Sequence, residues 1–472
     1  MSRGKELTKN TIIVSIGRIC TQCISFFLLP LYTAKLTTEE YGTVDLLNTY
    51  VLLLIPIIIF EIQQAIFRYL IDARKDEQEK IKIISSALII AIIQSGIYLI
   101  IYAIIGKFIN NNYKYFLATN VIATIFSSIM LQIARGFGDN KNYAIGSFIT
   151  ASFTIIFNVI FIAGFNLGAY GMLTASLISN VFCALYIIIK LKLYRYIKLK
   201  EFNFKKVKEM WKYSIPLIPN AISWWIMSAS DRTIITTFLG VGQNGIYSAA
   251  NKFSSIYSTF TNIFSITWTE TVSTHINDKD SAEYFSKLIN IVFNIFTTIS
   301  LGIISLVPFV FNIFINENFN EAFYQIPILM FGTLANTMVI LISGLYIAKK
   351  MTKQVARTSI VAAIINIILD IILIKYIGLY AASISTFVAY LSMMIYRMLD
   401  IKKYINIKFD IAQILKSFFI GIIIVILYYI NNLWLNIISL VIVVLYGLYI
   451  NKEVIKNLKN EGFSFVKKIL KH

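Results

Sequence analysis

The sequence is poor in the residues on which soluble enzymes depend. Only 14% of its 472 residues are charged, and it has three cysteines and two histidines. A soluble domain is about one quarter charged, so this chain lacks the polar surface that water requires. The histidines, His275 and His472, form no convergent site, and Cys20 and Cys23 have no second ligand pair. With no phosphate-binding glycine loop either, we expect no metal, no cofactor and no enzyme.

Long apolar runs take the place of the missing charge. Hydrophobic residues make up 57% of the chain, and the mean hydropathy is +0.72. Runs of about 18 or more apolar residues recur from end to end, each long enough to cross a bilayer. The sequence therefore predicts an all-α polytopic membrane protein with about fourteen transmembrane helices, at 11–34, 44–66, 82–106, 114–135, 143–164, 170–191, 213–237, 245–269, 287–311, 324–347, 355–376, 379–398, 410–430 and 433–451.

Lysine and arginine alternate in number along the segments between these helices. One set of alternate segments holds 35 of them and the other set holds 4, with Arg18, Arg232, Lys252 and Lys416 inside helices. Positive residues collect on the cytoplasmic side, so both termini are predicted to be cytoplasmic. The net charge of +19 then describes a cytoplasmic face that attracts anionic membrane lipids, and it requires no nucleic acid.

The chain contains internal repeats. The segment 157–176 resembles 365–386: each begins with an asparagine, Asn158 or Asn366, and continues to a motif of Gly, any residue, Tyr and a small residue. A weaker echo links 36–48 to 239–251, in which Leu36, Gly42 and Asn48 correspond to Leu239, Gly245 and Asn251. These matches predict a duplicated six-helix unit.

The repeats suggest five regions. We expect a first six-helix lobe at 1–192, a basic cytoplasmic linker at 193–212, a second six-helix lobe at 213–403, two additional transmembrane helices at 404–452 and a basic tail at 453–472. Two repeated lobes in one membrane chain point to a transporter whose substrate path runs between them.

Charged residues inside the helices mark the predicted path. Asp231 and Arg232 stand side by side in the apolar stretch "SASDRTIITTFLG". A charge near a helix centre costs about 2.5–3.5 kcal/mol on insertion scales, so it faces a partner or a watery cavity. Asp45 lies near the same outer boundary in the first lobe. We expect it to approach Arg232 and Lys252 when the outer side is closed, and Asp231 to hold Lys252 when that side is open.

The eighth predicted helix carries a polar stripe at helical spacing. Its members are Tyr247, Asn251, Ser254, Ser258, Asn262, Ser265 and Thr269, with Lys252 beside them. Such a stripe predicts a helix that lines water, although isolated Ser and Asn residues also serve as hydrogen-bonding contacts between packed helices. Arg18 and Gln22 extend the pattern to the first helix, and Glu61 to the second. Asp370, one turn after Asn366, is a further acid within a helix.

Three stretches resemble a known family. They are "LTTEEYGTVDLL", "SIPLIPNAISWWIMSASDRTIITTFLGVGQNGIYSAANK" and the two Asn…Gly-x-Tyr segments. They are similar to the polysaccharide flippase branch of the multidrug/oligosaccharidyl-lipid/polysaccharide (MOP) exporter superfamily. The resemblance covers the first twelve helices. It departs from the lipid II flippases of that superfamily in having few arginines within the membrane.

The resemblance implies a function. It implies an exporter of the bacterial cytoplasmic membrane that flips a polyprenyl-pyrophosphate-linked oligosaccharide by alternating access, alongside other polysaccharide-assembly proteins. It also implies that Arg18 and Arg232 contact the pyrophosphate. For the remaining substrate contacts we expect Gln22, Trp224, Asn251, Lys252, Ser258 and Asn262, and for gating or ion coupling Asp45, Glu61, Asp231 and Asp370.

Two other functions are alternatives. A multidrug antiporter of the same superfamily would expel organic cations and would need an acid-lined pocket, for which Glu61, Asp231 and Asp370 are few. A membrane polysaccharide polymerase or glycosyltransferase would need a large loop or an acidic or histidine site. The sequence does not identify the sugar, the lipid carrier or the driving force. The driving force could be a proton gradient acting through Asp370 or Glu61, a sodium gradient, the membrane potential or downhill exchange.

Overall fold

The computed structural model describes residues 26–108 and 111–456, and within them every regular element is a helix. Each predicted range from 82–106 onward overlaps one long helix, and 44–66 overlaps two, so the all-α polytopic prediction is confirmed. Most of the first range lies outside the described residues; its end forms α2 (Leu29–Lys35). Eleven helices of the described residues are long and apolar enough to cross a membrane. The long helices α10 (Ile218–Leu239) and α11 (Val241–His275) are too polar to join them.

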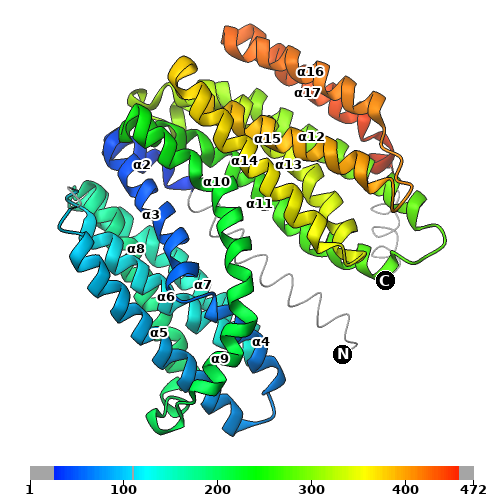
Figure 1. Ribbon diagram of the computed structural model, residues 1–472. Helices are drawn as coiled ribbons and strands as arrows, with labels where there is room; N and C mark the ends of the chain where they lie inside the picture. The colour runs from blue at the N-terminus through cyan, green and yellow to red at the C-terminus, as the bar shows by residue number, and fades with distance from the viewer. Residues whose placement is uncertain (1–25, 109–110, 457–472) are drawn as a thin grey trace, which may run out of the picture. The chain divides into compact units, whose positions relative to one another are not determined.

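The chain divides by its internal contacts into two units, 1–248 and 249–472 (Figure 1). The first contains α2 and α3 (Thr38–Ile58), α4 (Ile62–Asp72), α5 (Glu77–Ile105), α6 (Lys114–Gly136), α7 (Asn140–Asn158), α8 (Gly168–Lys190), α9 (Phe204–Ser214), α10 and the start of α11. Its apolar core is built mainly from α3 to α6, where Ile62, Val121 and Ile129 are fully buried. The predicted region boundaries at 192 and 213 stay a prediction.

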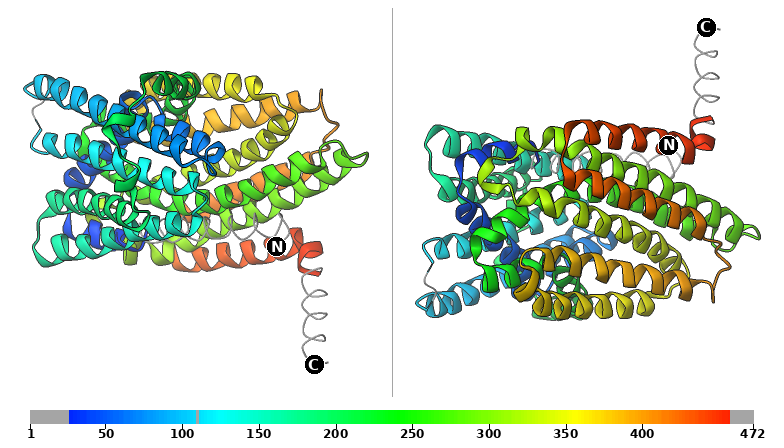
Figure 2. Two further views of the ribbon diagram at one scale, coloured as in Figure 1. Left: turned by 90° about the horizontal axis from the view of Figure 1, so that it is seen from below. Right: turned by 90° about the horizontal axis from the view of Figure 1, so that it is seen from above.

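The second unit is formed by the rest of α11 and six helices. These are α12 (Ser281–Phe314), α13 (Ala322–Ala348), α14 (Thr352–Ile377), α15 (Tyr380–Ile401), α16 (Ile411–Ile430) and α17 (Leu433–Ile450). Helix α15 packs against both α13 and α14. The last two helices, orange to red in Figure 2, run beside α12 as a separate pair.

The second predicted span is broken. Where the sequence predicts one helix at 44–66, the structure has α3 and α4 with a turn between them. Phe60 and Glu61 in this turn have φ angles of 51° and 55°, in the left-handed region that a right-handed helix excludes. Pro56 one turn earlier has no N–H to donate to the helix. The break therefore places Glu61 at a helix start instead of within a continuous span.

The first glycine of each Gly-x-Tyr motif has a positive φ angle. Gly168 starts α8 with a φ of 53°, and Gly378 ends α14 with a φ of 57°. Glycine takes this conformation without the steric cost that a Cβ atom would bring. Just before the first motif, α7 continues as a π-helix at Val159–Gly164. The two glycines that correspond in the sequence repeat thus share a positive φ angle.

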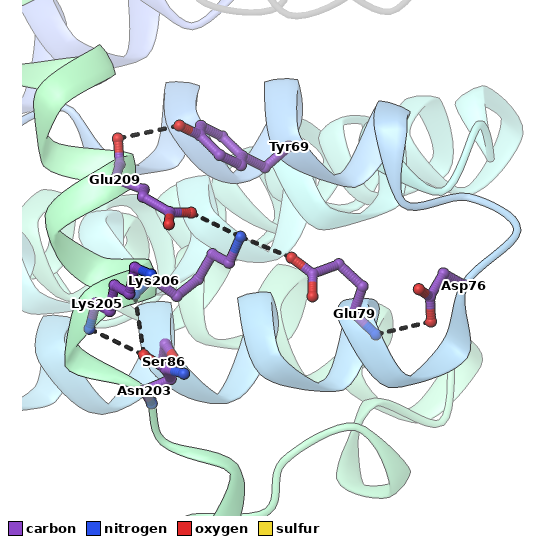
Figure 3. A network of polar contacts seen from close by, with 8 residues as sticks. All are labelled: Tyr69, Asp76, Glu79, Ser86, Asn203, Lys205, Lys206 and Glu209. Atoms are coloured by element: carbon purple, nitrogen blue, oxygen red, sulfur yellow. Dashed lines mark hydrogen bonds and ion pairs between the residues drawn. The ribbon is translucent and has the colours of Figure 1, made fainter.

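The basic segment predicted as a linker contains most of the helix α9, which is docked on its neighbours (Figure 3). Lys206 on α9 lies between Glu79 of α5, at 2.7 Å, and Glu209, at 2.8 Å. The Tyr69 hydroxyl on α4 donates to the Glu209 backbone carbonyl at 3.0 Å. Asn203 caps α9 by accepting from the backbone amides of Lys205 and Lys206. Helix α9 is consequently fixed to α4 and α5.

Candidate functional site

The arginine of the charged dipeptide pairs with the first lobe's acid. Arg232 Nε on α10 lies 2.7 Å from Asp45 Oδ2 on α3. Its Nη1 donates to the Ser228 backbone carbonyl at 2.8 Å, and the Ser248 hydroxyl donates to the same Asp45 oxygen. The side chains of Arg232 and Asp45 keep 15% and 20% of their surface exposed. A charge-assisted contact of this kind is shorter and stronger than one between neutral groups.

The adjacent Asp231 has a different partner. Its side chain is buried, and its Oδ2 accepts from the Tyr247 hydroxyl on α11 at 2.8 Å. Consecutive helical residues point about 100° apart, so one charge faces α3 and the other faces α11. This arrangement explains why an acid and a base stand side by side on α10.

Two glycines bring α3 and the start of α11 together. A Cβ atom on Gly42 would collide with the Val241 carbonyl oxygen, and one on Gly245 would collide with the Thr38 carbonyl oxygen. Asn244 Nδ2 donates to the Gly42 carbonyl at 2.8 Å across this crossing. The glycines are the corresponding positions of the weaker sequence echo. Their contact sets the distance at which Ser248 reaches Asp45.

The two tryptophans of α10 are not equivalent. Trp225 Nε1 donates to the Thr49 carbonyl of α3 at 2.8 Å, one helical turn after Asp45. Trp224 exposes 54% of its surface. Of the two, Trp224 is thus the more exposed, and its contact with a sugar stays a prediction.

The polar stripe of α11 is interrupted. Its substrate candidates Asn251, Lys252 and Ser258 are half-buried and Asn262 is exposed. Ser254, in contrast, is buried with its hydroxyl 3.9 Å from the sulfur of Met330. The expectation of one continuous water-lined stripe is wrong at Tyr247 and Ser254, because both side chains are buried against protein.

The acid of α14 lies in the core of the second unit. Asp370 and Asn366 are both fully buried. Asn366 Nδ2 donates to the hydroxyls of Ser385 and Thr386 on α15 at 3.3 and 3.2 Å. Burying a carboxylate is costly unless it is paired, hydrogen-bonded or protonated, so the ion-coupling role of Asp370 stays a prediction.

The inner-side candidates are described only in part. Arg18 and Gln22 lie outside the described residues. Glu61 is buried at the break between α3 and α4, where its Oε2 accepts from Gln63 Nε2 at 2.7 Å. Within 26–108 and 111–456, no three His, Cys, Asp or Glu side chains are grouped closely enough to hold a metal.

Sequence reasoning missed a buried arginine. The charge count places Arg397 in a cytoplasmic segment, whereas the structure buries it in α15 at 1% exposure. Its guanidinium donates to the Val339 carbonyl and the Ser343 hydroxyl on α13 and to the Thr358 hydroxyl on α14. These acceptors belong to other helices, so the sequence around Arg397 does not reveal them. The one sequence signal for its burial is that Arg397 lies before the end of the apolar run.

Comparisons with known proteins agree with this architecture. A search of curated proteins found no match. A solved structure described as "Lipid II flippase MurJ, inward closed conformation" is similar at a TM-score of 0.70 and 18% identity, covering 96% of this chain and 99% of that one. An inward-facing multidrug resistance MATE family transporter of the MOP superfamily is similar at a TM-score of 0.68 and 15% identity, covering 82% of this chain and 98% of that one.

These similarities establish the fold, and a sequence comparison establishes the family. The family profile described as "Polysaccharide biosynthesis protein" matches residues 7–269, more than half of the chain. That range includes the charged dipeptide, the Gly42–Gly245 crossing and most of α11. The chain therefore belongs to the polysaccharide biosynthesis protein family and has the fold of MOP-superfamily transporters.

Proposed function

We propose that this protein flips a polyprenyl-pyrophosphate-linked oligosaccharide across the bacterial cytoplasmic membrane by alternating access. The single observation that carries the proposal is the family match across residues 7–269, which connects the chain to polysaccharide biosynthesis. The lipid II flippase with the same fold acts on a lipid-linked substrate, which supports the same class of substrate here.

The pair between Arg232 and Asp45 gives the proposal a physical basis. A guanidinium has a planar set of donors that suits phosphate oxygens. While Asp45 holds Arg232 Nε, that donor is engaged. When this contact opens, Arg232 becomes available to bind the pyrophosphate. After the substrate is released, Asp45 pairs with Arg232 again. Arg18 would perform the corresponding contact on the inner side.

The multidrug alternative has less support from the described acids. An organic cation would need a carboxylate that is available in the substrate path. Asp45 is engaged by Arg232 and Ser248, and Asp231 by Tyr247. Coupling to a proton or sodium gradient through Asp370 is compatible with either substrate and remains part of the proposal.

A flipping assay tests the function. The full-length protein is reconstituted in liposomes that carry a polyprenyl-pyrophosphate disaccharide, and an impermeant glycosidase reports which headgroups are outside. We expect the protein to make the headgroups that initially face the liposome interior accessible to the glycosidase. Arg232→Ala should lower the rate of this flipping at least tenfold. The matched control is Arg68→Ala, which removes an exposed arginine paired only with its helix neighbour Asp72.

The assay also separates the alternatives. Accessibility no faster than in protein-free liposomes would contradict the flippase proposal. Gradient-driven uptake of an organic cation such as ethidium, without headgroup flipping, would assign the chain to the multidrug class instead.

A further inference from the structure

The second unit contains an apolar groove that the proposed path does not use. It is about 380 Å³ in volume and lies between α15 and α16, with α12 and α13 as its floor. Phe293, Phe331, Phe387 and Phe418 line it from four different helices. Its residues are apolar except for Thr297, Ser417 and Lys402, so it offers no set of donors for a sugar or a pyrophosphate.

Two of the residues that line the groove are exposed leucines, one on each helix. Leu399 on α15 is 63% exposed and Leu415 on α16 is 61% exposed, whereas Leu301 on the floor is fully buried. Exposed leucines on two membrane helices contact hydrocarbon chains instead of water. A lipid chain in the bilayer can therefore enter the groove from the side.

The length of the groove fits a chain anchored at one membrane surface. Helix α15 lines it from Phe387 to Lys402, a rise of about 22 Å at about 1.5 Å per residue. Half of the hydrocarbon core is about 15 Å thick. A chain that starts at the headgroup level beside Lys402 would thus run along α15 past the bilayer centre.

Lys402 supplies a positive charge at one end. The preceding acid, Asp400, is engaged by Lys403 at 3.0 Å and by the Tyr346 hydroxyl at 2.8 Å. Lys402 forms no ion pair within the described residues, and its Nζ lies 5.9 Å from the ring centre of Phe409. The predicted orientation puts this end on the cytoplasmic side, where anionic headgroups attract lysines.

We propose that this groove binds one acyl chain of an anionic phospholipid of the cytoplasmic leaflet, with the phosphate beside Lys402. A monoanionic headgroup needs only one cation. The pyrophosphate of the transported substrate carries more charge and suits arginine donors, which the groove lacks. The site would hold the appended pair α16–α17 against the rest of the second unit through a lipid, and it does not depend on the proposed transport function.

Lipid binding to the purified full-length protein tests the proposal. Native mass spectrometry in a neutral detergent counts bound dioleoyl phosphatidylglycerol against dioleoyl phosphatidylcholine during titration. We expect one tight phosphatidylglycerol site, weakened about fivefold by Lys402→Gln. Lys403→Gln is the matched control, because that neighbouring lysine already pairs with Asp400.

A second variant blocks the groove itself. Leu391→Trp adds an indole to the groove wall and should remove the tight site, whereas Leu445→Trp on the exposed face of α17 should not. Equal affinity for the two lipids, or unchanged binding in Leu391→Trp, would overturn the proposal. Displacement of phosphatidylglycerol by undecaprenyl phosphate, with the same dependence on Lys402 and Leu391, would also overturn it by assigning the groove to the polyprenyl chain.

Discussion

Asp231 and Arg232 show how neighbouring charges are accommodated within one membrane helix. Each has a partner on a different helix, Tyr247 on α11 and Asp45 on α3. Removing one member of a mostly buried charge pair such as Arg232–Asp45 leaves the other uncompensated, which is more costly than losing an exposed pair. The consequences of substitution here should therefore exceed those at the exposed Arg68–Asp72 pair.

Asp45→Asn should loosen the contact between α3 and α10. The amide keeps the size of the side chain but loses the charge that attracts Arg232. In a background without the three native cysteines, Thr49→Cys, which is buried next to the Trp225 contact, serves as the reporter. We expect an impermeant maleimide to label it about three to ten times faster in Asp45→Asn, the effect of a bias of about 1 kcal/mol. Asp72→Asn is the control. Equal labelling of the reporter protein with and without Asp45→Asn or Asp72→Asn would show that the Asp45–Arg232 contact does not act as a gate.

Asp370→Asn should remove the response of transport to its driving gradient. Asp370 is fully buried and is the acid that we propose for ion coupling, and an asparagine in its place can neither bind nor release a proton. Flipping in proteoliposomes is measured with a proton gradient, with a sodium gradient and with none. We expect acceleration in one of the gradients for the wild type and none for Asp370→Asn. The exposed helix cap Asp410→Asn should behave as the wild type. A gradient response that survives in Asp370→Asn would exclude this residue as the coupling group.

At the scale of the element, α9 is the most informative helix. Burial alone would lower the pKa of Lys206, but its hydrogen bonds with Glu209 and Glu79 outweigh burial and raise it. The same hydrogen bond lowers the pKa of Glu209. A lowered acid pKa gives stability that is lost as the pH falls through it, and a raised lysine pKa gives stability that is lost as the pH rises through it. The docking of α9 is therefore independent of pH around neutrality.

Lys206→Gln should release α9 from α4 and α5. Chymotrypsin reports this release, because Tyr194 and Phe202 are exposed before the start of α9 and Phe204 is exposed at its first residue. We expect cleavage in this region to be severalfold faster in Lys206→Gln, and unchanged in Lys205→Gln, whose side chain is exposed without an ion pair in the described residues. For the wild type, the rate corrected for protease activity should stay constant from about pH 6 to about pH 9. Equal cleavage of both variants would show that the Lys206 network does not hold the helix.

The elements were more predictable than their interruptions. The apolar runs located every long helix from α3 onward, because a membrane span must be long and mostly apolar, but they did not separate α4 from α3 or find the short helix α9. The break at Phe60 and Glu61 could not be predicted, since left-handed residues other than glycine persist only where surrounding structure holds them. The burial of Arg397 depends in the same way on acceptors from α13 and α14.

The sequence identified the charged residues of the candidate site, but it identified fewer of the residues that contact them. Asp231 and Arg232 stand out because charge is rare in the helices, and the sequence also indicated Asp45 as a partner for Arg232. Tyr247 as the partner of Asp231 could not be predicted, because a tyrosine in an apolar helix is common. The half-buried Asn251 and Ser258 share the spacing of the buried Ser254, and helical spacing alone does not distinguish them.

At the scale of the whole molecule, the Gly42–Gly245 crossing joins two helices that are far apart in the sequence, and both glycines belong to the first unit. A side chain at either glycine would collide with the opposite backbone. Gly42→Leu should thus prevent the approach of α3 and α11, abolish flipping and raise labelling of Thr49→Cys, while the protein remains in the membrane at normal amounts. The control is Gly96→Leu, because a Cβ atom at Gly96 meets open space. Normal flipping by Gly42→Leu would show that transport does not require this crossing.

The low hydropathy of α10 has a consequence for how the protein is made. Of the described helices, α10 and α11 lack the apolar window that marks the other long ones. The partner of Arg232, Asp45, leaves the ribosome long before it, with the first helices of the chain. During synthesis α10 therefore enters a membrane that already contains α3, and the Asp45 carboxylate offsets the insertion cost of its arginine. Loss of Asp45 should accordingly slow the integration of α10 into the membrane during synthesis, in addition to its effect on transport.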